Sequence, residues 1–401
     1  MNIMPKKLSK RLYNITSKQI SALLVLSIVA TTGTYLIIGS HAASPYASLN
    51  ANTGTLTGGA VPQADSTASD GTKVLFNGTS TTQTTNCMPS PEACGYPDPA
   101  ATSGSSVIGP VDSNGNSVAC SSLPSSGSIT STSTGQSITG LNITGYVLVT
   151  SSNVTLNNDC ITQSGGGSAC TNSTGSGSSH ACFPLWVESG SATVTNTTIR
   201  GADASTNSII GVSSNTNSSA TMNHDYVYNC TECIYYSWTV NNSYITSNGN
   251  NTAHPEDVYL SDTSFTANHD TFISGVGLDT DAVFFGDTNG GSGGACDDQW
   301  TVKNSLLTVS NNGNYVVGTC GNSSSAGPSA LLDFEDNDFG PGGNACGDGG
   351  IVWDTHCGEN GNNVGAWCSG LGSRLTWTGN FRDSNGATVY CSPSGNAPTG
   401  P

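Results

Sequence analysis

The stretch YVLVTSSNVTLNNDCI (residues 146–161) decides the fold, because it returns as PLWVESGSATVTNTTI (184–199). Its second half is a repeat phrase: apolar, Thr, apolar, Asn, two polar residues, one residue of any type and a final apolar residue. Successive copies lie at unequal distances, as expected for rungs of one length with loops inserted in some of them. The other copies are ATMNHDYV (220–227), WTVNNSYI (238–245), FTANHDTF (265–272) and WTVKNSLL (300–307), and more loosely LDFEDNDF (332–339) and LTWTGNFR (375–382).

A short pair of strands cannot bury its apolar face alone, whereas stacked rungs build one continuous core. The Asn residues of the phrase fall at turns, where their side chains hydrogen-bond neighbouring backbone and tolerate left-handed conformations. We therefore predict an all-β fold, a right-handed parallel β-helix that forms a solenoid of about eight rungs over residues 136–391. A β-sandwich is the alternative fold, but its strands would not repeat one phrase.

The composition agrees with a solenoid. Only 9% of the 401 residues are charged, against roughly 25% in a typical soluble domain. Gly, Ser, Thr and Asn take their place, and these residues favour turns and strand ends over helices. Such a chain is either disordered or a β-solenoid with many turns, and the recurring Val, Ile, Tyr and Trp residues favour the solenoid.

The N-terminus carries a compartment signal. Residues 1–19 contain five basic residues and no acid, and an apolar run follows over residues 20–40. We predict a cytoplasmic basic segment followed by a transmembrane anchor or signal segment. Ser40-His41-Ala42 fits a cleavage site, but the run is long for a signal peptide, so both readings stay open. The rest of the chain is then at the cell surface or secreted.

Beyond residue 43 the chain has 27 acidic residues and five basic ones, a net charge of −22. Nothing offsets phosphate repulsion, so we exclude a nucleic-acid partner and expect a monomer. All 14 cysteines lie in this part, and an even number outside the cell indicates disulfides. The spacing Cys230-x-x-Cys233 occurs in zinc sites, but without a second CxxC or a nearby pair of His residues it favours a disulfide or a buried thiol.

Two segments precede the repeats. Residues 44–80 contain GTLTGGA and DSTASDGTKVLF, and they resemble the opening of secreted carbohydrate-binding β-sandwich modules. Because a sandwich needs about 100 residues, we predict a small β stub or spacer without a binding site. Residues 81–135 are rich in Ser, Thr, Pro and Gly, and we predict a linker and cap with Cys87, Cys94 and Cys120 as staples.

Three stretches, CGYPDPAATSG (94–104), ITGLNITGYVLVTSSNVTLNN (138–158) and SATVTNTTI (191–199), carry a wider resemblance. They resemble secreted bacterial right-handed parallel β-helix repeat proteins of the pectate-lyase-like superfamily, over roughly residues 94–390. The resemblance implies the fold, and the superfamily's enzymes mostly cleave polysaccharides as lyases or hydrolases. The chain lacks their Gly-His-Gly with a downstream Arg-x-Lys, Asp297-Asp298 stands alone, and no Arg lies in a basic groove.

An acidic column is predicted within the repeats. Aligning TECIYYS (231–237), PEDVYLS (255–261) and TDAVFFG (280–286) places Glu232, Glu256 and Asp281 at one position. Equivalent residues of a parallel β-helix stack about 4.8 Å apart, so the three carboxylates should form one column. Like charges at that spacing repel unless a proton or a cation intervenes.

Three uses of this column stay open. Glu256 and Asp281 could form a catalytic pair assisted by Glu232 or His254, since adjacent carboxylates suit a retaining glycosidase and a wider pair an inverting one. A Ca²⁺ ion could instead take oxygen ligands from Glu256, Asp257, Asp279 and Asp281. The plain alternative is that these acids flank strands, exposed and unpaired.

The remaining polar and aromatic residues refine the hypothesis. His224-Asp225 and His269-Asp270 share one place in the phrase, which favours a turn role. Half of the recurring aromatic residues should point inward, and any outward ones beside the carboxylates would form a sugar-stacking platform. A one-residue register error reverses these directions. The aromatic residues concerned are Tyr235, Tyr236, Tyr259, Phe284, Phe285, Trp238 and Trp300.

We therefore predict an extracellular or cell-surface β-helix that engages glycan and for which hydrolysis of a neutral polysaccharide is the candidate reaction. Polyuronates are disfavoured without calcium, because the repeats contain few cations to bind them. A non-catalytic adhesin or structural envelope protein is one alternative, and a calcium-dependent polysaccharide lyase is another. Whether the protein is an enzyme stays open.

Overall fold

The chain divides into two units, residues 1–81 and 82–401. In the first, strands β1 (Ala60–Ala64) and β2 (Thr72–Phe76) pair antiparallel, inside the region expected to form a small β stub. The computed structural model describes residues 60–64, 72–76, 86–163, 183–201, 210–214, 218–236, 238–247, 256–260, 264–274, 281–285, 299–309, 315–318, 331–340, 352–353, 375–386 and 388.

The segments predicted over residues 1–19 and 20–40 lie outside these ranges. Two 3₁₀ helices are described, Pro91–Cys94 and Cys120–Ser122. Among the described residues, no helix is long and apolar enough to cross a membrane.

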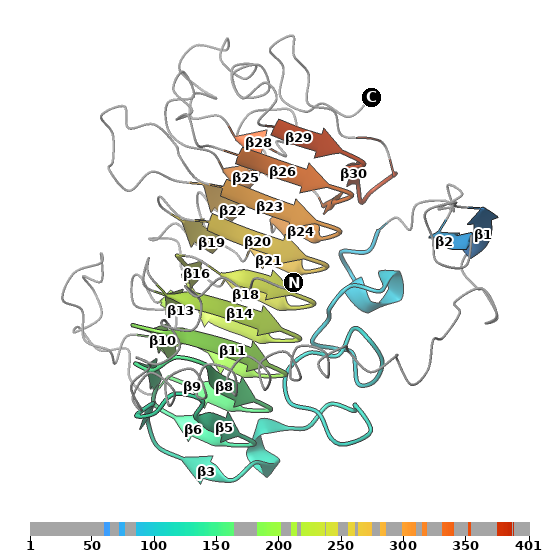
Figure 1. The fold of residues 1–401 in the computed structure, drawn as a ribbon. Coiled ribbons are helices and arrows are strands. Elements are labelled where there is room, and N and C mark those ends of the chain that lie inside the picture. The colour runs from blue at the N-terminus through green and yellow to red at the C-terminus, as the bar shows by residue number, and fades with distance from the viewer. Residues whose placement is uncertain are drawn as a thin grey trace, which may run out of the picture. The chain divides into compact units, whose positions relative to one another are not determined.

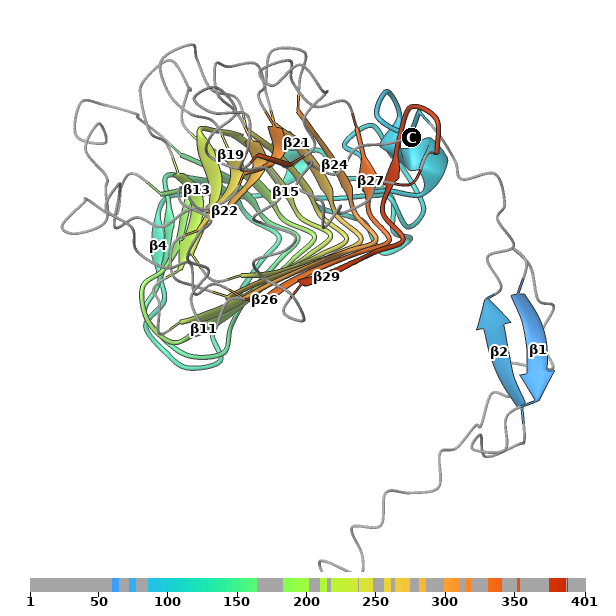
Figure 2. The ribbon, with the colours of Figure 1, turned by 90° about the horizontal axis from the view of Figure 1, so that it is seen from above.

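In the second unit the chain passes through three parallel sheets in turn, so that each strand pairs with the strand three places further along (Figure 1). Figure 2 looks along the stack and shows the sheets as the walls of one coil. Sheet I contains β4 (Ile129–Thr130), β7 (Val147–Val149), β10 (Leu185–Val187), β13 (Ile210–Ser214), β16 (Glu232–Tyr235), β19 (Glu256–Leu260), β22 (Asp281–Phe285), β25 (Tyr315–Gly318) and β28 (Val352–Trp353).

Sheet II contains β5 (Ser137–Thr139), β8 (Val154–Asn157), β11 (Ser191–Thr195), β14 (Ser219–Asn223), β17 (Thr239–Asn241), β20 (Ser264–Asn268), β23 (Gln299–Lys303), β26 (Leu331–Glu335) and β29 (Leu375–Thr378). Sheet III contains β3 (Ser125–Ser126), β6 (Asn142–Thr144), β9 (Cys160–Thr162), β12 (Thr198–Arg200), β15 (Tyr226–Cys230), β18 (Tyr244–Ser247), β21 (Thr271–Ser274), β24 (Leu306–Val309), β27 (Asp338–Phe339) and β30 (Phe381–Arg382).

This arrangement is compatible with the predicted parallel β-helix. The described stack is slightly longer than expected, with nine strands in sheets I and II and ten in sheet III. Strand β5 belongs to a further copy of the phrase, in which Thr139 replaces the Asn and Gly140 and Leu141 replace the two polar residues, and β3 and β4 precede residue 136. Because of these substitutions, the first coil does not show the phrase in its sequence.

One apolar core runs through the coils because side chains alternate along each strand. In β11, Ala192 and Val194 point into the core, while Ser191, Thr193 and Thr195 lie on the outer side. The inward positions of the other sheet II strands are also apolar, for example Met222, Val240, Val302 and Phe334. A single coil could not bury this surface alone.

The corner between sheets II and III is the same in every coil, with two residues between the strands. The first of them always has a positive φ, between 49° and 70°, which Gly, Asn, Asp and His tolerate best. The turn role predicted for His224 and His269 is confirmed. These residues are Gly140, Asn158, Asn196, His224, Asn242, His269, Asn304, Asp336 and Gly379.

From the second coil onward, the second residue of this corner is buried and polar. Its side chain accepts the backbone N–H of its counterpart one coil earlier. Thr197 N–H donates to Asp225 Oδ1 (2.7 Å), Asp225 N–H to Ser243 Oγ (3.0 Å), Ser243 N–H to Asp270 Oδ1 (2.7 Å) and Asp270 N–H to Ser305 Oγ (3.0 Å). We call this column the turn ladder; its members are Asp159, Thr197, Asp225, Ser243, Asp270, Ser305, Asn337 and Asn380.

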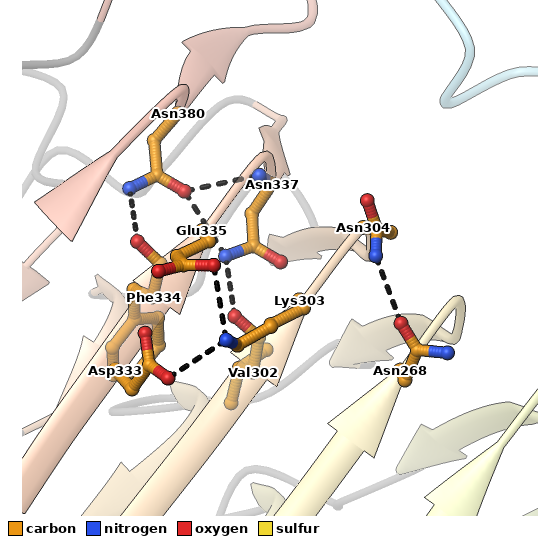
Figure 3. Close-up of polar contacts among 9 residues, drawn as sticks. All are labelled: Asn268, Val302, Lys303, Asn304, Asp333, Phe334, Glu335, Asn337 and Asn380. Carbon is orange, nitrogen blue, oxygen red and sulfur yellow. Dashed lines mark hydrogen bonds and ion pairs between the residues drawn. The ribbon is translucent and has the colours of Figure 1, made fainter. Parts of the chain in front are cut away.

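The turn ladder changes its side-chain type toward the C-terminal end, where two amides replace the carboxylates and hydroxyls. Asn337 N–H donates to Asn380 Oδ1 (3.0 Å), and the two side-chain amides donate to the carbonyls of Val302 (2.8 Å) and Phe334 (2.9 Å) (Figure 3). Each ladder side chain therefore hydrogen-bonds backbone groups at or beside this corner.

Residues 86–118 form a strap over the outer side of sheet III. The strap contacts the last coil through Asp383, the middle of the stack through His269 and Thr271, and the earlier coils through His224 and Asn158 (Figure 1). The contacts include Thr271 Oγ1–H to Pro97 O (2.8 Å) and stacking of Tyr96 on His269. The region predicted to be a linker and cap thus spans most of the stack.

We expect Asp270→Ala to destabilise the coil. The change leaves the buried N–H of Ser243 and the partly buried N–H of Asn268 without their acceptors, and the loss at a buried donor costs about 1–3 kcal/mol. Urea unfolding should show a clearly lower midpoint. Asp270→Asn is the matched control, because the chain already uses Asn at this position in Asn337 and Asn380, and its loss should be smaller. Equal midpoints for wild type and Asp270→Ala would contradict the role of the turn ladder.

Candidate functional site

Sheet I lies between the two corners whose length varies. From sheet III to sheet I the connection ranges from Thr231 alone to residues 163–184, and from sheet I to sheet II it ranges from residues 188–190 to 354–374. Insertions in repeat proteins gather on one face, which is often the binding face. The outer face of sheet I is therefore the candidate functional surface.

The predicted acidic column exists in sheet I. Glu232 pairs in register with Glu256, and Glu256 with Asp281, on three successive coils. Adjacent strands of a sheet are about 4.8 Å apart. The backbone thus aligns the three carboxyl-bearing residues as expected from the sequence.

An outer aromatic column runs parallel to the acidic one. Trp186, Tyr235 and Tyr259 form a small apolar cluster with Phe183 and Tyr236, separate from the main core. Their inward neighbours, such as Ile234 and Val258, belong to that core. Tyr235 and Tyr259 pair in register, and their rings stack 5.4 Å apart with planes 10° from parallel. Alternation therefore places these rings on the outer side of sheet I.

The disulfide between Cys230 and Cys233 holds Glu232 in place, because it spans the Cys-Thr-Glu-Cys segment. Cys230 and Cys233 are both buried in the core. The structure thus has a disulfide at this spacing, one of the two interpretations that the sequence favoured. The Thr231 carbonyl accepts Glu256 N–H (2.8 Å), which links this segment to the next coil.

Glu232 is the half-buried acid beside the aromatic column. Desolvation raises the pKa of Glu232 to about 7. Burial raises the pKa of Tyr235, and the nearby Glu232 charge raises it further. The charge of Glu232 thus acts on the Tyr235 hydroxyl, and a carboxyl with a pKa near 7 has the protonation behaviour of a general acid.

Glu256 and Asp257 are far less accessible. Glu256 is 4% exposed, whereas Asp257 is fully buried and accepts Ser247 N–H (2.6 Å). Burial raises the pKa of Asp257 well above its ordinary value. Consecutive strand residues point to opposite sides, so Glu256 and Asp257 are poorly arranged to share the predicted calcium ion.

The other predicted site residues are only partly described. His254 and Asp279 lie outside the described ranges, and for Asp281 the structure describes the backbone alone. The predicted catalytic pair of Glu256 and Asp281 and the predicted calcium ligands therefore stay predictions. The backbone pairing places Glu256 in register with Asp281.

The aromatic candidates divide as alternation requires. Trp238 and Trp300 are buried in the core, and Trp238 Nε1–H donates to the Tyr235 carbonyl (3.2 Å). Tyr236 follows Tyr235 with a positive φ of 67°, a strained value for a bulky residue. This conformation brings its ring edge-on against Tyr235, with centroids 4.3 Å apart. The side chains of Phe284 and Phe285 lie outside the part of the chain that the structure describes.

Sequence reasoning missed two parts of this site. Trp186 and Phe183 belong to the aromatic cluster, with ring centroids 5.0 Å apart. Trp186 stands in register with Ser213, which pairs with Tyr235, and this equivalence was available from the repeat alignment. The two cysteines that form the disulfide on either side of Glu232, Cys230 and Cys233, were also visible as a sequence pattern.

Comparison with known proteins does not identify a family. No family model, curated protein or solved structure matches the chain. The resemblance to pectate-lyase-like β-helix proteins therefore stays a prediction.

We expect the stability of the wild-type protein relative to Glu232→Gln to fall as pH rises from about 4.5 to above 7. The folded pKa of Glu232 is about 7, above the ordinary value of about 4.3. A raised acid pKa stabilises the folded state at low pH, and this contribution is lost as pH rises through the folded pKa. Melting temperatures measured between pH 4.5 and 8.5 test this. The exposed Glu92→Gln variant is the control, and a pH-independent difference for Glu232→Gln would contradict the assignment.

Proposed function

We propose that this protein is a cell-surface or secreted right-handed parallel β-helix that binds a neutral extracellular glycan along sheet I and hydrolyses it there. The observation that carries the proposal is the half-buried Glu232 beside the outward, stacked rings of Tyr235 and Tyr259. Right-handedness is supported by the general rule that parallel crossover connections have this hand in about 98% of cases.

The aromatic column supports glycan binding. A sugar ring has an apolar C–H face that packs on an aromatic ring and hydroxyl groups that need polar partners. Stacked Tyr rings with a carboxyl nearby supply both, and the coil repeat spaces such groups along a line. A chain molecule with repeating units is the natural ligand for a repeating surface.

Charge supports a neutral glycan. The strands of sheet I contain no Lys or Arg. Lys303 lies on sheet II, where its ammonium group bonds the carboxylates of Asp333 and Glu335, each at 2.9 Å (Figure 3). An anionic polysaccharide would meet Glu232, Glu256 and Asp281 without compensating cations.

The acidic column supports hydrolysis. Glu232, protonated near neutral pH, would donate its proton to the glycosidic oxygen as the leaving group departs. A second carboxylate would then attack the anomeric carbon or activate a water molecule. Glu256 on the adjacent coil matches the retaining separation of about 5 Å, and Asp281 two coils away lies near the inverting limit of about 9.5 Å.

We expect Tyr259→Ala to weaken glycan binding by about tenfold, because it removes the ring stacked on Tyr235; that factor corresponds to about 1.4 kcal/mol. Glu232→Gln should bind normally and release reducing ends at least about 100-fold more slowly. Affinity would be measured on a panel of neutral glycans, and product by reducing ends. Thr266→Ala, an exposed change on sheet II, is the control and should alter neither.

Three results would redirect the proposal. Binding that depends on Tyr259 without any product would indicate the non-catalytic adhesin. Unsaturated products formed only with Ca²⁺ would indicate the calcium-dependent lyase. Unchanged activity in Glu232→Gln would remove Glu232 from the site and leave Glu256 and Asp281 as the pair.

A further inference from the structure

Two buried carboxyl groups meet where the strap begins and the stack ends. Asp338 opens β27 and is 0% exposed, and Asp383 follows β30 and is 2% exposed. Both belong to the sheet III side, on other elements than the sheet I column. One carboxylate oxygen of each lies within 4.8 Å of the other and of Cys87 Sγ.

The hydrogen bonds of the two carboxyl groups differ. Asp383 accepts the backbone N–H groups of Cys87 and Met88 from the strap, the latter at 3.1 Å. Among the described residues, no N–H or O–H donor bonds either oxygen of Asp338, although both are buried, and the side-chain partner of Asp338 is the carboxyl group of Asp383. A buried carboxylate without donors is strongly unfavourable unless something neutralises it.

The neighbouring groups do not supply a positive charge. Among the side chains that the structure describes, neither carboxylate is paired with a Lys or Arg. Tyr96 of the strap lies close enough for the charges of Asp338 and Asp383 to add to the effect of burial, and all three raise its pKa. Its phenol therefore stays neutral. What remains to neutralise the pair is a shared proton or a bound cation.

We propose that Asp338 and Asp383 bind a hard divalent cation, calcium, which fastens the start of the strap to the last coil. Carboxylate oxygens are the ligands calcium prefers, and the two oxygens of Asp338, which accept no N–H or O–H donor among the described residues, would supply two of its roughly six to eight ligands. Cys87 is bonded to Cys94, so its sulfur is not a thiolate. This excludes the cysteine-ligated zinc site that the cluster of residue types would otherwise suggest.

The cation would act on the attachment of the strap. It would cancel the repulsion between two buried charges and hold Asp383 in the position that accepts the strap amides. The strap covers the outer side of sheet III as far as Asn158. Its loss would expose this face, so calcium bound at one end would stabilise the whole length. This site is separate from the calcium set predicted around Glu256.

The test is thermal unfolding of the full chain at pH 7.5, with a chelator or with millimolar CaCl₂. Wild type should melt several degrees higher with calcium, because a ligand that binds only the folded state raises its stability. Asp338→Asn should lose this calcium-dependent shift. Glu92→Gln, which removes an exposed charge from the same strap, should keep it. Calorimetric titration of wild type with CaCl₂ should show a binding site, which tests the proposal even if Asp338→Asn does not fold.

Two outcomes would overturn the proposal. Calcium stabilisation retained in Asp338→Asn would place the ion elsewhere. Absence of any calcium effect in wild type would leave a shared proton. In that case, since burial and the adjacent Asp383 raise the pKa of Asp338 to about 8, wild type would lose stability as pH rises through 8, and Asp338→Asn would not.

Discussion

The turn ladder is the interaction on which the rest of the coil depends. The two-residue corner between sheets II and III buries backbone N–H groups that no strand can satisfy, and each finds its acceptor on the next coil. Because a buried amide without a partner is costly, coils cannot slip past one another by a residue without breaking every rung of the ladder. The register of all three sheets follows from this constraint.

This register has a functional consequence on sheet I. The corner that contains the turn ladder never varies in length, whereas the two corners next to sheet I do. Insertions are therefore placed where they leave the ladder undisturbed, and equivalent residues of sheet I still stand directly above one another. Glu232, Glu256 and Asp281 form one line and Tyr235 and Tyr259 another for this reason. A rigid column of this kind holds side chains one strand spacing apart, and no loop is needed to position them.

Much of this could be predicted from sequence, and the limit has a physical cause. The repeat phrase reports strand alternation and left-handed Asn and His turns, so the sheets, the acidic column and the role of His224 followed from it. The direction of each side chain was harder, because consecutive core residues Cys233 and Ile234 break simple alternation before Tyr235. The contact of Cys87 with Asp383, which are 296 residues apart in the sequence, leaves no local pattern at all.

The buried acids of this protein fall into two groups, those whose charge is stabilised by backbone N–H groups and those without such donors. In the turn ladder, Asp225 and Asp270 are buried and each accepts two backbone N–H groups, which offsets the cost of the charge, although burial still raises their pKa values. Asp338 has no such donors, and Glu232 sits half-buried beside aromatic rings. A chain that places acids in its interior for architecture keeps them in place with backbone amides. Glu232 and Asp338 have no such amides among the described residues, so we propose a chemical partner for each, a glycan for Glu232 and a cation for Asp338.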